Sequence, residues 1–377
     1  MTRSLGICAY LPISLSPYLS NSYLSNFLST SPQPISILNV AAWLLTIGLV
    51  LLLIIFGKDY LVPIFMALVI WYLVNALSTL FQRIPFIGKY LPEGVTLLMS
   101  LFFIGLSIYL LADTLVTTIQ GFVQDSPKYL PKVEAQIDKV ITFFQPDAAP
   151  YKLERQGIMN TISANWAELL SGFGNFAKSL FLVLLYVLFF ILEQGVFGRK
   201  MEALGYGLDQ PNRLSMVLRE VNRAMRTYLG VKTLTSLITA ILSWIVFEAI
   251  GLDYALFWGF LIFLFNYIPT IGSITATGLP AFLALVQFES LSPFLIVAIG
   301  VSAIQVLIGN ILEPRLMGDT LNISPLVVVL TLILWSLLWG VVGMLLSVPI
   351  TVAIIIVCAQ FPTTRGVAIL LSKDGRV

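Results

Sequence analysis

The chain has 377 residues, of which 58% are hydrophobic and 11% are charged. A soluble protein carries about 25% charged residues, so this composition predicts an all-α, polytopic integral membrane protein. The chain has no histidine, which excludes histidine metal sites and Ser-His or Cys-His catalytic pairs, and its net charge of +2 gives no indication of a nucleic-acid partner. Its two cysteines, Cys8 and Cys358, form no metal motif or disulfide framework. We therefore expect no catalytic residues, no metal and no cofactor.

The N-terminal third is predicted to hold a tail and three membrane helices. Residues 1–34 contain a single charge, Arg3, and prolines that interrupt the apolar runs. This pattern favours a disordered tail, or a start assigned too early, over a secretory signal peptide. Residues 35–116 contain three apolar stretches separated by short polar turns. Each stretch has the ~20 residues that a transmembrane helix needs.

The middle of the chain is predicted to hold a polar insert, a fourth membrane helix and a basic helix. Residues 117–178 mix acidic and basic residues with apolar residues at helical spacing, which predicts amphipathic helices. A solvated insert and a functional gate both fit this pattern. Residues 179–227 contain a fourth apolar stretch followed by the strongest basic cluster of the chain. The positive-inside rule places that cluster in the cytoplasm, which makes the insert extracytoplasmic and both chain ends cytoplasmic.

Residues 228–358 are predicted to form the transport core, followed by a cytoplasmic tail over 359–377. The core contains two units, 228–288 and 294–358, each an apolar span followed by an apolar segment with a broken middle. The first break lies at Pro269 and Gly272, which disfavour a continuous helix. Its two arms are short, so we interpret it as a re-entrant hairpin that enters from outside; two full, tilted spans are the alternative. This gives about eight membrane segments.

The two units also resemble each other at a fixed distance. Pro280 and Pro349 are 69 residues apart, and Gly272 and Gly340 are 68 residues apart. The predicted topology places the second hairpin, at 321–357, on the opposite side of the membrane from the first. This is an inverted repeat, and transporters with such repeats bind substrate where two broken elements meet near the midplane of the bilayer. We therefore expect the two hairpin tips to form a translocation site.

Polar side chains near the breaks are the candidate site residues. At the first tip they either bind a solute or satisfy the broken backbone. The amides that follow either face a cavity or join helices. The substrate or translocation set is Asn266, Tyr267, Pro269, Thr270, Gly272, Ser273, Gln305 and Asn310. The candidates for a gate or for cation or proton coupling are Glu313, Arg315, Glu248 and Asp113, for which a structural ion pair and exposure to water at the interface are the alternatives.

Three sequence blocks resemble a known family. FNYIPTIGS (265–273), GNILEPRLMGDTLNISPLVVVL (309–330) and LLWGVVGMLLSVPITV (337–352) resemble the signature blocks of the autoinducer-2 exporter (AI-2E) family. The resemblance implies a multi-pass protein of the prokaryotic cell membrane that forms homo-oligomers. It implies transport of a small signalling molecule in some members and Na⁺(Li⁺)/H⁺ exchange in others. It also implies shape and hinge roles for Pro314, Gly318, Gly340, Gly343 and Pro349.

The broken hairpins and the family resemblance together predict a secondary transporter of the inner membrane. The favoured activity is export of a small polar molecule of the autoinducer-2 type. The alternative within transport is a Na⁺(Li⁺)/H⁺ antiporter, and the alternative from another class is a non-transporting membrane scaffold. The expected partners are the lipid bilayer, a small polar solute or a monovalent cation or proton, and further copies of the same chain.

Overall fold

The computed structural model of the chain describes residues 37–84, 90–146, 180–200, 213–318 and 322–375, and those residues are helical with no strand. Seven of the described helices are long and apolar enough to cross a membrane, and two shorter apolar helices accompany them. The prediction of an all-α, polytopic membrane protein is confirmed. The predicted tail over 1–34, the insert from residue 147 to 178 and the linker 201–212 lie outside the described residues.

The chain divides into two units, Met1–Leu53 and Ile54–Val377. In the first unit the structure describes most of helix α2 (Ile37–Phe56), whose leucine side chains from Leu44 to Leu53 are exposed. The second unit contains the remaining helices. Their bounds are α3 (Lys58–Arg83), α5 (Glu93–Phe144), Leu180–Lys200, α7 (Arg213–Ile250), α8 (Ala255–Phe265), α9 (Ile271–Phe288), α10 (Leu291–Leu307), η1 (Ile308–Leu312), α11 (Glu313–Met317), α12 (Pro325–Gln360) and α13 (Arg365–Leu371).

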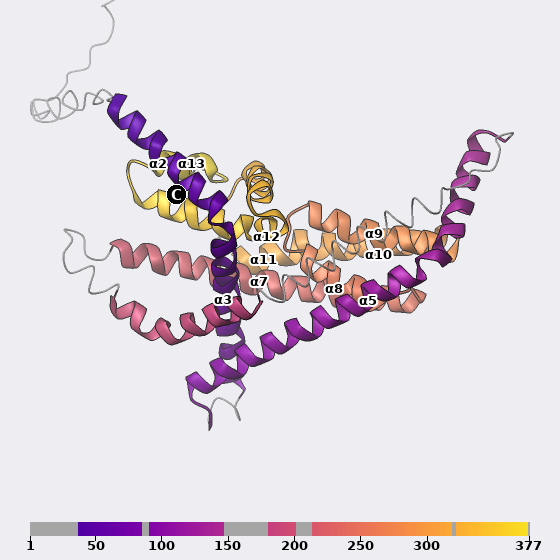
Figure 1. Cartoon of the computed structure of the whole chain (residues 1–377), viewed down its shortest axis with the longest axis horizontal. Coiled ribbons are helices and arrows are strands. Elements are labelled where there is room, and N and C mark those ends of the chain that lie inside the picture. The colour runs from indigo at the N-terminus through magenta and orange to yellow at the C-terminus, as the bar shows by residue number, and fades with distance from the viewer. Residues whose placement is uncertain (1–36, 85–89, 147–179, 201–212, 319–321, 376–377) are drawn as a thin grey trace, which may run out of the picture. The chain divides into compact units, whose positions relative to one another are not determined.

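Helix α5 is the longest helix of the second unit. It has 52 residues, more than twice the ~20 that a transmembrane helix needs. It carries the third predicted span into the amphipathic segment as one helix, which contains Pro127 and Pro131 and bends sharply before its end at Phe144 (Figure 1). Its membrane part packs with α3 and with Leu180–Lys200 through Val74, Leu97 and Val187. The part after the candidate span Glu93–Phe122 therefore belongs to the same helix but ends in a segment turned away from the span's axis (Figure 1).

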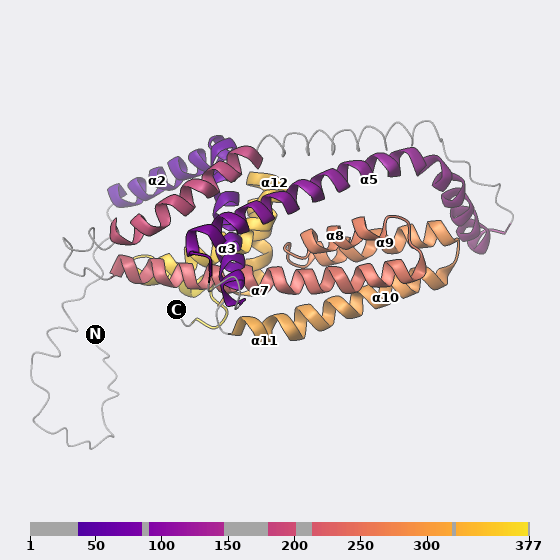
Figure 2. The same cartoon turned by 90° about the horizontal axis from the view of Figure 1, so that it is seen from below.

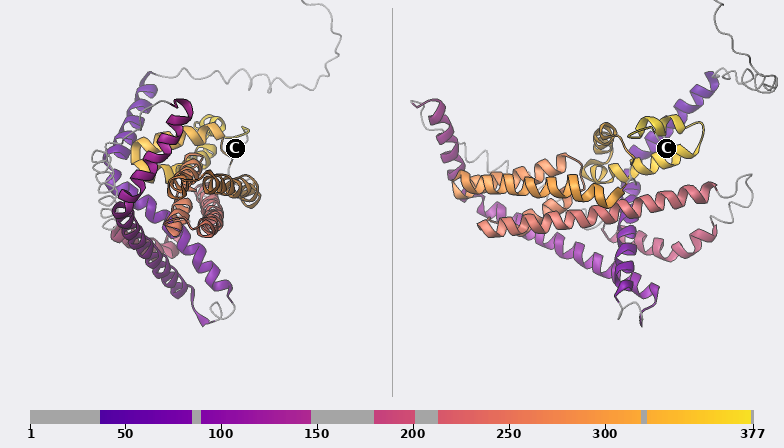
Figure 3. Two further views of the ribbon diagram at one scale, coloured as in Figure 1. Left: turned by 90° about the vertical axis from the view of Figure 1, so that its right-hand side faces the viewer. Right: turned by 180° about the vertical axis from the view of Figure 1, so that it is seen from behind.

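Helices α8 and α9 form a hairpin between α7 and α10. Helix α8 has 11 residues, or about 16 Å, which is too short to cross the membrane. It runs back along α7, and α9 then returns beside α10, as the views from two sides show (Figures 2 and 3). At the base, the Asp253 N–H donates to Gln287 Oε1 at 2.8 Å, and Gln287 Nε2 donates to the Gly251 carbonyl at 2.9 Å. Both ends of the hairpin therefore lie together, and the shortness of α8 favours the re-entrant hairpin over two full spans.

Helix α12 is a second hairpin. It consists of two helical halves that meet at Gly340, whose φ of 61° and ψ of −141° are not helical. A Cβ on Gly343 would lie 1.9 Å from the Trp335 carbonyl oxygen, whereas eight residues of straight helix would separate these positions by about 12 Å. The chain therefore folds back on itself, which is why Val328 of the first half packs in the same apolar cluster as Val348 of the second half.

The two hairpin tips are built in the same way. A Cβ on Gly272 would lie 1.8 Å from the Phe265 carbonyl oxygen, just as one on Gly343 would meet the carbonyl of Trp335. Each tip also contains a residue of positive φ, Thr270 in the first and Gly340 in the second. The structural counterpart of Gly272 is therefore Gly343, and the pairing of Gly272 with Gly340 that the spacing predicted is wrong.

The bases of the two hairpins lie at opposite ends of α7. The base of α8–α9 follows directly on Ile250, the last residue of α7. The base of α12 packs near the other end of α7, where Met317, Ile323 and Val328 contact the cluster that contains Met225. This arrangement supports an inverted repeat in the C-terminal half.

Candidate functional site

A largely buried ion pair lies beside the tip of the first hairpin. Lys232 Nζ of α7 lies 2.9 Å from Glu313 Oε1 and 3.0 Å from Oε2. The two side chains are 12% and 15% exposed, whereas the side chains of the other described ion pairs are at least 35% exposed. A charge within a membrane span is costly, so such residues pair with one another and mark functional positions. This pair is the electrostatic centre of the candidate site.

Hydroxyl and amide groups extend the ion pair toward the hairpin tip. Thr235 Oγ1 donates to Glu313 Oε2 at 3.3 Å. The hydroxyls of Thr233 and Tyr267 are 2.7 Å apart, and Asn266 Nδ2 donates to Ser236 Oγ at 3.0 Å. The first tip is thus joined to α7 through polar groups. We call Lys232, Thr233, Thr235, Ser236, Asn266, Tyr267 and Glu313 the tip cluster.

A buried polar stripe on α7 continues from the tip cluster. Thr235, Ser236, Thr239 and Ser243 recur at helical spacing and are each at most 1% exposed. Thr239 Oγ1 donates back to the Thr235 carbonyl, while Ser243 Oγ has no hydrogen-bond partner among the described residues. An apolar membrane helix thereby presents a line of hydroxyl groups to the hairpin and α10.

A π-helical turn sets the position of Glu313. Residues Ile308–Leu312 form this turn between α10 and α11, and the Glu313 N–H donates to the Ile308 carbonyl five residues earlier. Pro314 follows and has no N–H to continue the α-helical ladder, which the wider turn accommodates. Such turns are frequent at functional sites. Here the turn places the Glu313 carboxylate within hydrogen-bond distance of Lys232 and Thr235 on α7.

The tip itself contains a strained turn. Thr270 has φ 60° and ψ −62°, and the Ile271 N–H donates to the Pro269 carbonyl at 2.6 Å. These values describe the rare and strained form of γ-turn. Gly272 is the residue that lets the chain pass this close to Phe265. The tip is therefore a tightly determined break in the helix, as Pro269 and Gly272 predicted.

The remaining predicted site residues take no part in the hydrogen bonds described for the tip cluster. Ser273 lies in the first turn of α9, and Gln305 Nε2 donates to Thr277 Oγ1 at 2.9 Å, which joins α10 to α9. The other four are exposed. Those four are Asn310, Arg315, Asp113 and Glu248.

The second hairpin tip is apolar and does not contact the first. Trp335 and Trp339 have ring centroids 5.0 Å apart, and Trp339 lies 5.3 Å from the ring of Phe65 on α3. Within the described elements, α12 contacts α3, α7 and α13 but neither α8 nor α9. The expected meeting of two tips is not what this structure shows, because each tip packs on a different long helix. The polar chemistry lies at the first tip alone.

The sequence interpretation missed the α7 half of the tip cluster. Lys232 closes a run of basic residues that the positive-inside rule assigns to the cytoplasm, and its partner lies 81 residues further on. A usable signal was present, however. The hydroxyl residues Thr235, Ser236, Thr239 and Ser243 follow Lys232 on one helical face of an otherwise apolar segment.

Comparisons with known proteins give a consistent match over most of the chain. The model of a family described as AI-2E family transporter matches residues 43–362. A "Putative transport protein" of Haemophilus influenzae is 34% identical over 83% of this chain and 88% of its own length. The "AI-2 transport protein TqsA" of Escherichia coli K12 is 30% identical over 90% of this chain and 98% of its own length. The "Putative permease PerM" of the same organism is 26% identical over 82% of this chain and 90% of its own length.

Proposed function

Because the chain belongs to the AI-2E transporter family, we propose that it is a secondary transporter that exports a small polar signalling molecule of the autoinducer-2 type. The name of TqsA, an AI-2 transport protein, supports this class of solute. The tip cluster is the binding site in this proposal. The bilayer is the working environment, and homo-oligomers of the chain are part of the proposal through the family resemblance.

The observation that carries the proposal is the polar character of the tip cluster inside a membrane span. Its Lys232 and Glu313 charges compensate each other, so the site as a whole is close to neutral. The surrounding groups of Ser236, Asn266 and Tyr267 supply hydrogen-bond donors and acceptors. A small neutral solute with several hydroxyl or carbonyl groups could exchange bonds with these residues without bringing a new charge into the membrane.

We further propose a cytoplasmic location for the basic start of α7. Arg219, Arg223 and Arg226 lie on its first turns, ahead of the apolar part of the helix. The positive-inside rule places such residues in the cytoplasm. The base of the first hairpin then lies outside, the base of the second lies inside, and both chain ends are cytoplasmic.

A flux assay in proteoliposomes tests the proposal. The purified chain should move labelled autoinducer-2, and Asn266→Ala should lower the flux by about threefold to tenfold, because one lost hydrogen bond is worth about 0.5–1.5 kcal/mol. Asn75→Ala is the matched control, since it removes the same amide from α3, where Asn75 Nδ2 donates to the Trp71 carbonyl outside the tip cluster. Its flux should stay within twofold of the unsubstituted chain.

Three results would count against the proposal. Equal effects of the Asn266 and Asn75 substitutions would contradict the placement of the site. Na⁺- or Li⁺-dependent proton exchange without solute flux would favour the antiporter. The absence of every flux, with Asn266→Ala harmless in cells, would favour the scaffold.

A further inference from the structure

The first hairpin has an unusual backbone conformation at all three of its corners. In the described chain the non-glycine residues of positive φ are Tyr254 at 62°, Thr270 at 60° and Glu289 at 51°. They precede α8, separate α8 from α9, and follow α9. A residue with a Cβ adopts such angles only when its surroundings impose them, and strain of this kind clusters at switching elements. The hairpin is therefore held in place against local backbone preferences.

Helix α5 holds the first of the two basal corners. The hydroxyl of Tyr254 donates to Asp125 Oδ2, and the hydroxyl of Tyr129 donates to Asp253 Oδ2. Lys128 Nζ lies 3.0 Å from Asp125 Oδ2 and 3.6 Å from Asp253 Oδ2, so one ammonium group bridges both carboxylates. These reciprocal tyrosine–aspartate bonds join α5 to the start of the hairpin.

The same face of α5 holds the second basal corner. Lys132 Nζ donates to the Gln287 carbonyl at 2.6 Å and lies 3.7 Å from the Glu289 carboxylate. Two helical turns on, Lys139 Nζ lies 3.4 Å from the Glu289 carbonyl oxygen. Both strained residues at the base are thus bonded by α5 side chains. The third corner, Thr270, lies at the tip beside α7.

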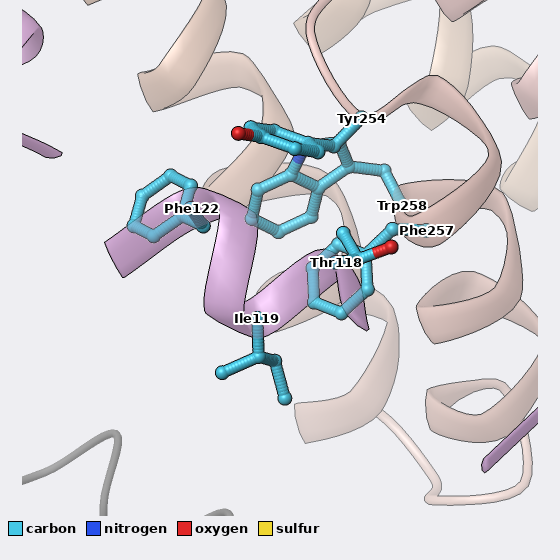
Figure 4. A pocket seen from close by; sticks show the side chains of 6 residues that line it. All are labelled: Thr118, Ile119, Phe122, Tyr254, Phe257 and Trp258. Atoms are coloured by element: carbon cyan, nitrogen blue, oxygen red, sulfur yellow. The ribbon is translucent and has the colours of Figure 1, made fainter. Parts of the chain in front are cut away.

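Below these polar bonds, aromatic rings complete the contact. Tyr254 and Phe122 have ring centroids 5.9 Å apart, and a Cβ on Gly121 would lie 3.5 Å from the Tyr254 hydroxyl. Together with Ile119 and Trp258 they border a small cavity of ≈ 10 Å³, with α5 on one side and the hairpin on the other (Figure 4). Trp258 Nε1 is buried and has no hydrogen-bond partner among the described residues. The aromatic side chains of α5 and the hairpin therefore pack closely, but the Trp258 N–H has no hydrogen-bond acceptor among the described residues.

Within the membrane, small residues line the surfaces on which the hairpin packs. Gly259 of α8 faces Ala240 and Trp244 of α7, and the buried face of α9 contains Ala276 and Ala284. Small residues at these positions let the helix backbones approach closely. The ion pairs at the base, by contrast, involve side chains that are 35–49% exposed, and exposed pairs exchange readily with water. The polar attachment at the base is therefore releasable, while large buried side chains such as Phe247 and Trp258 pack the rest of the hairpin.

We propose that the stretch Asp125–Lys139 of α5 is a latch that positions the α8–α9 hairpin, and that Tyr129 and Tyr254 are its positioning residues. The latch holds the strained base of the hairpin in the arrangement seen here. Its release lets the hairpin move relative to α7, which opens the tip cluster. This inference rests on the proposed transport function for its consequence, while the attachment itself is independent of what the chain transports.

The experiment uses the full-length chain with Tyr129→Phe and Tyr254→Phe combined. This variant keeps both rings and removes only the two hydroxyl donors. Hydrogen exchange of backbone amides over residues 254–271 should rise at least fivefold. In proteoliposomes the turnover of solute should rise about threefold to tenfold, with less than a twofold change in apparent KM, because the binding groups at the tip are untouched.

Tyr109→Phe is the matched control, since Tyr109 is an exposed tyrosine on the same helix. It should change neither measurement. Unchanged exchange in the double variant would overturn the latch whatever the protein transports. Raised exchange with unchanged turnover would overturn its role in the cycle. Absence of flux in the unsubstituted chain would refute the proposed function instead, and the exchange result would still decide whether α5 restrains the hairpin.

Discussion

The ion pair between Lys232 and Glu313 offers the sharpest test of the site. Replacing Glu313 by Gln leaves the Lys232 ammonium without its carboxylate at a position where that side chain is only 12% exposed. Breaking a buried pair from one side costs about 3–5 kcal/mol, and the residual exposure here favours the lower end, about 3 kcal/mol. Lys232→Met should cost a similar amount, since it leaves the Glu313 carboxylate unpaired.

The double variant should recover most of this loss. With both charges removed, neither side chain requires a counter-charge, so the coupling energy between the two sites should be about 2 kcal/mol or more. The measurement is a double-mutant cycle on the free energy of unfolding in detergent micelles. The exposed pair Lys200 and Glu193, with side chains 59% and 52% exposed, provides the control cycle and should give less than about 1 kcal/mol. Equal coupling in the two cycles would refute the view that the Lys232 pair is buried.

Two further predictions concern the hairpin. Gly272→Ala should destabilise the protein by about 2–3 kcal/mol, because its Cβ would lie 1.8 Å from a backbone oxygen, while Gly278→Ala on the open face of α9 should be close to neutral in the same unfolding assay. Hydrogen bonds from Tyr254 and then Lys128 hold the pKa of Asp125 below its usual value. The stability that these bonds add is therefore present above the ordinary pKa of about 3.9 and is lost as pH falls through the lower folded value. Backbone amide hydrogen exchange over residues 254–271, corrected for intrinsic rates, should therefore stay constant between about pH 5 and pH 8, where Asp125 is ionised. Faster exchange at pH 5 than at pH 8 would contradict this.

Local chemistry made the hairpin breaks predictable. Pro269 and Gly272 in an apolar run indicated a broken helix, and the structure ends α8 at Phe265 and begins α9 at Ile271. Gly340 and Gly343, which follow Trp335, indicated the second break in the same way. Both signals depend on residues close in sequence, whose backbone preferences act wherever the chain lies.

Long-range pairing was not predictable in this way. Nothing near Lys232 in the sequence indicates that Glu313 will neutralise it, and the π-helical turn that delivers Glu313 has no reliable sequence signature. The counterpart of Gly272 was likewise misassigned to Gly340, because spacing alone does not show which glycine approaches a carbonyl oxygen. These features depend on how separate helices pack.

The shortness of α8 constrains how the protein is made. With 11 residues and a polar end at Asn266, α8 cannot partition into the bilayer as an independent segment when it leaves the ribosome. Its backbone and its tip are satisfied only once α7 is in place to receive them, and its base closes only after Gln287 has been synthesised. The group from α7 to α9 is therefore the smallest unit in which the hairpin's tip and base bonds can all form.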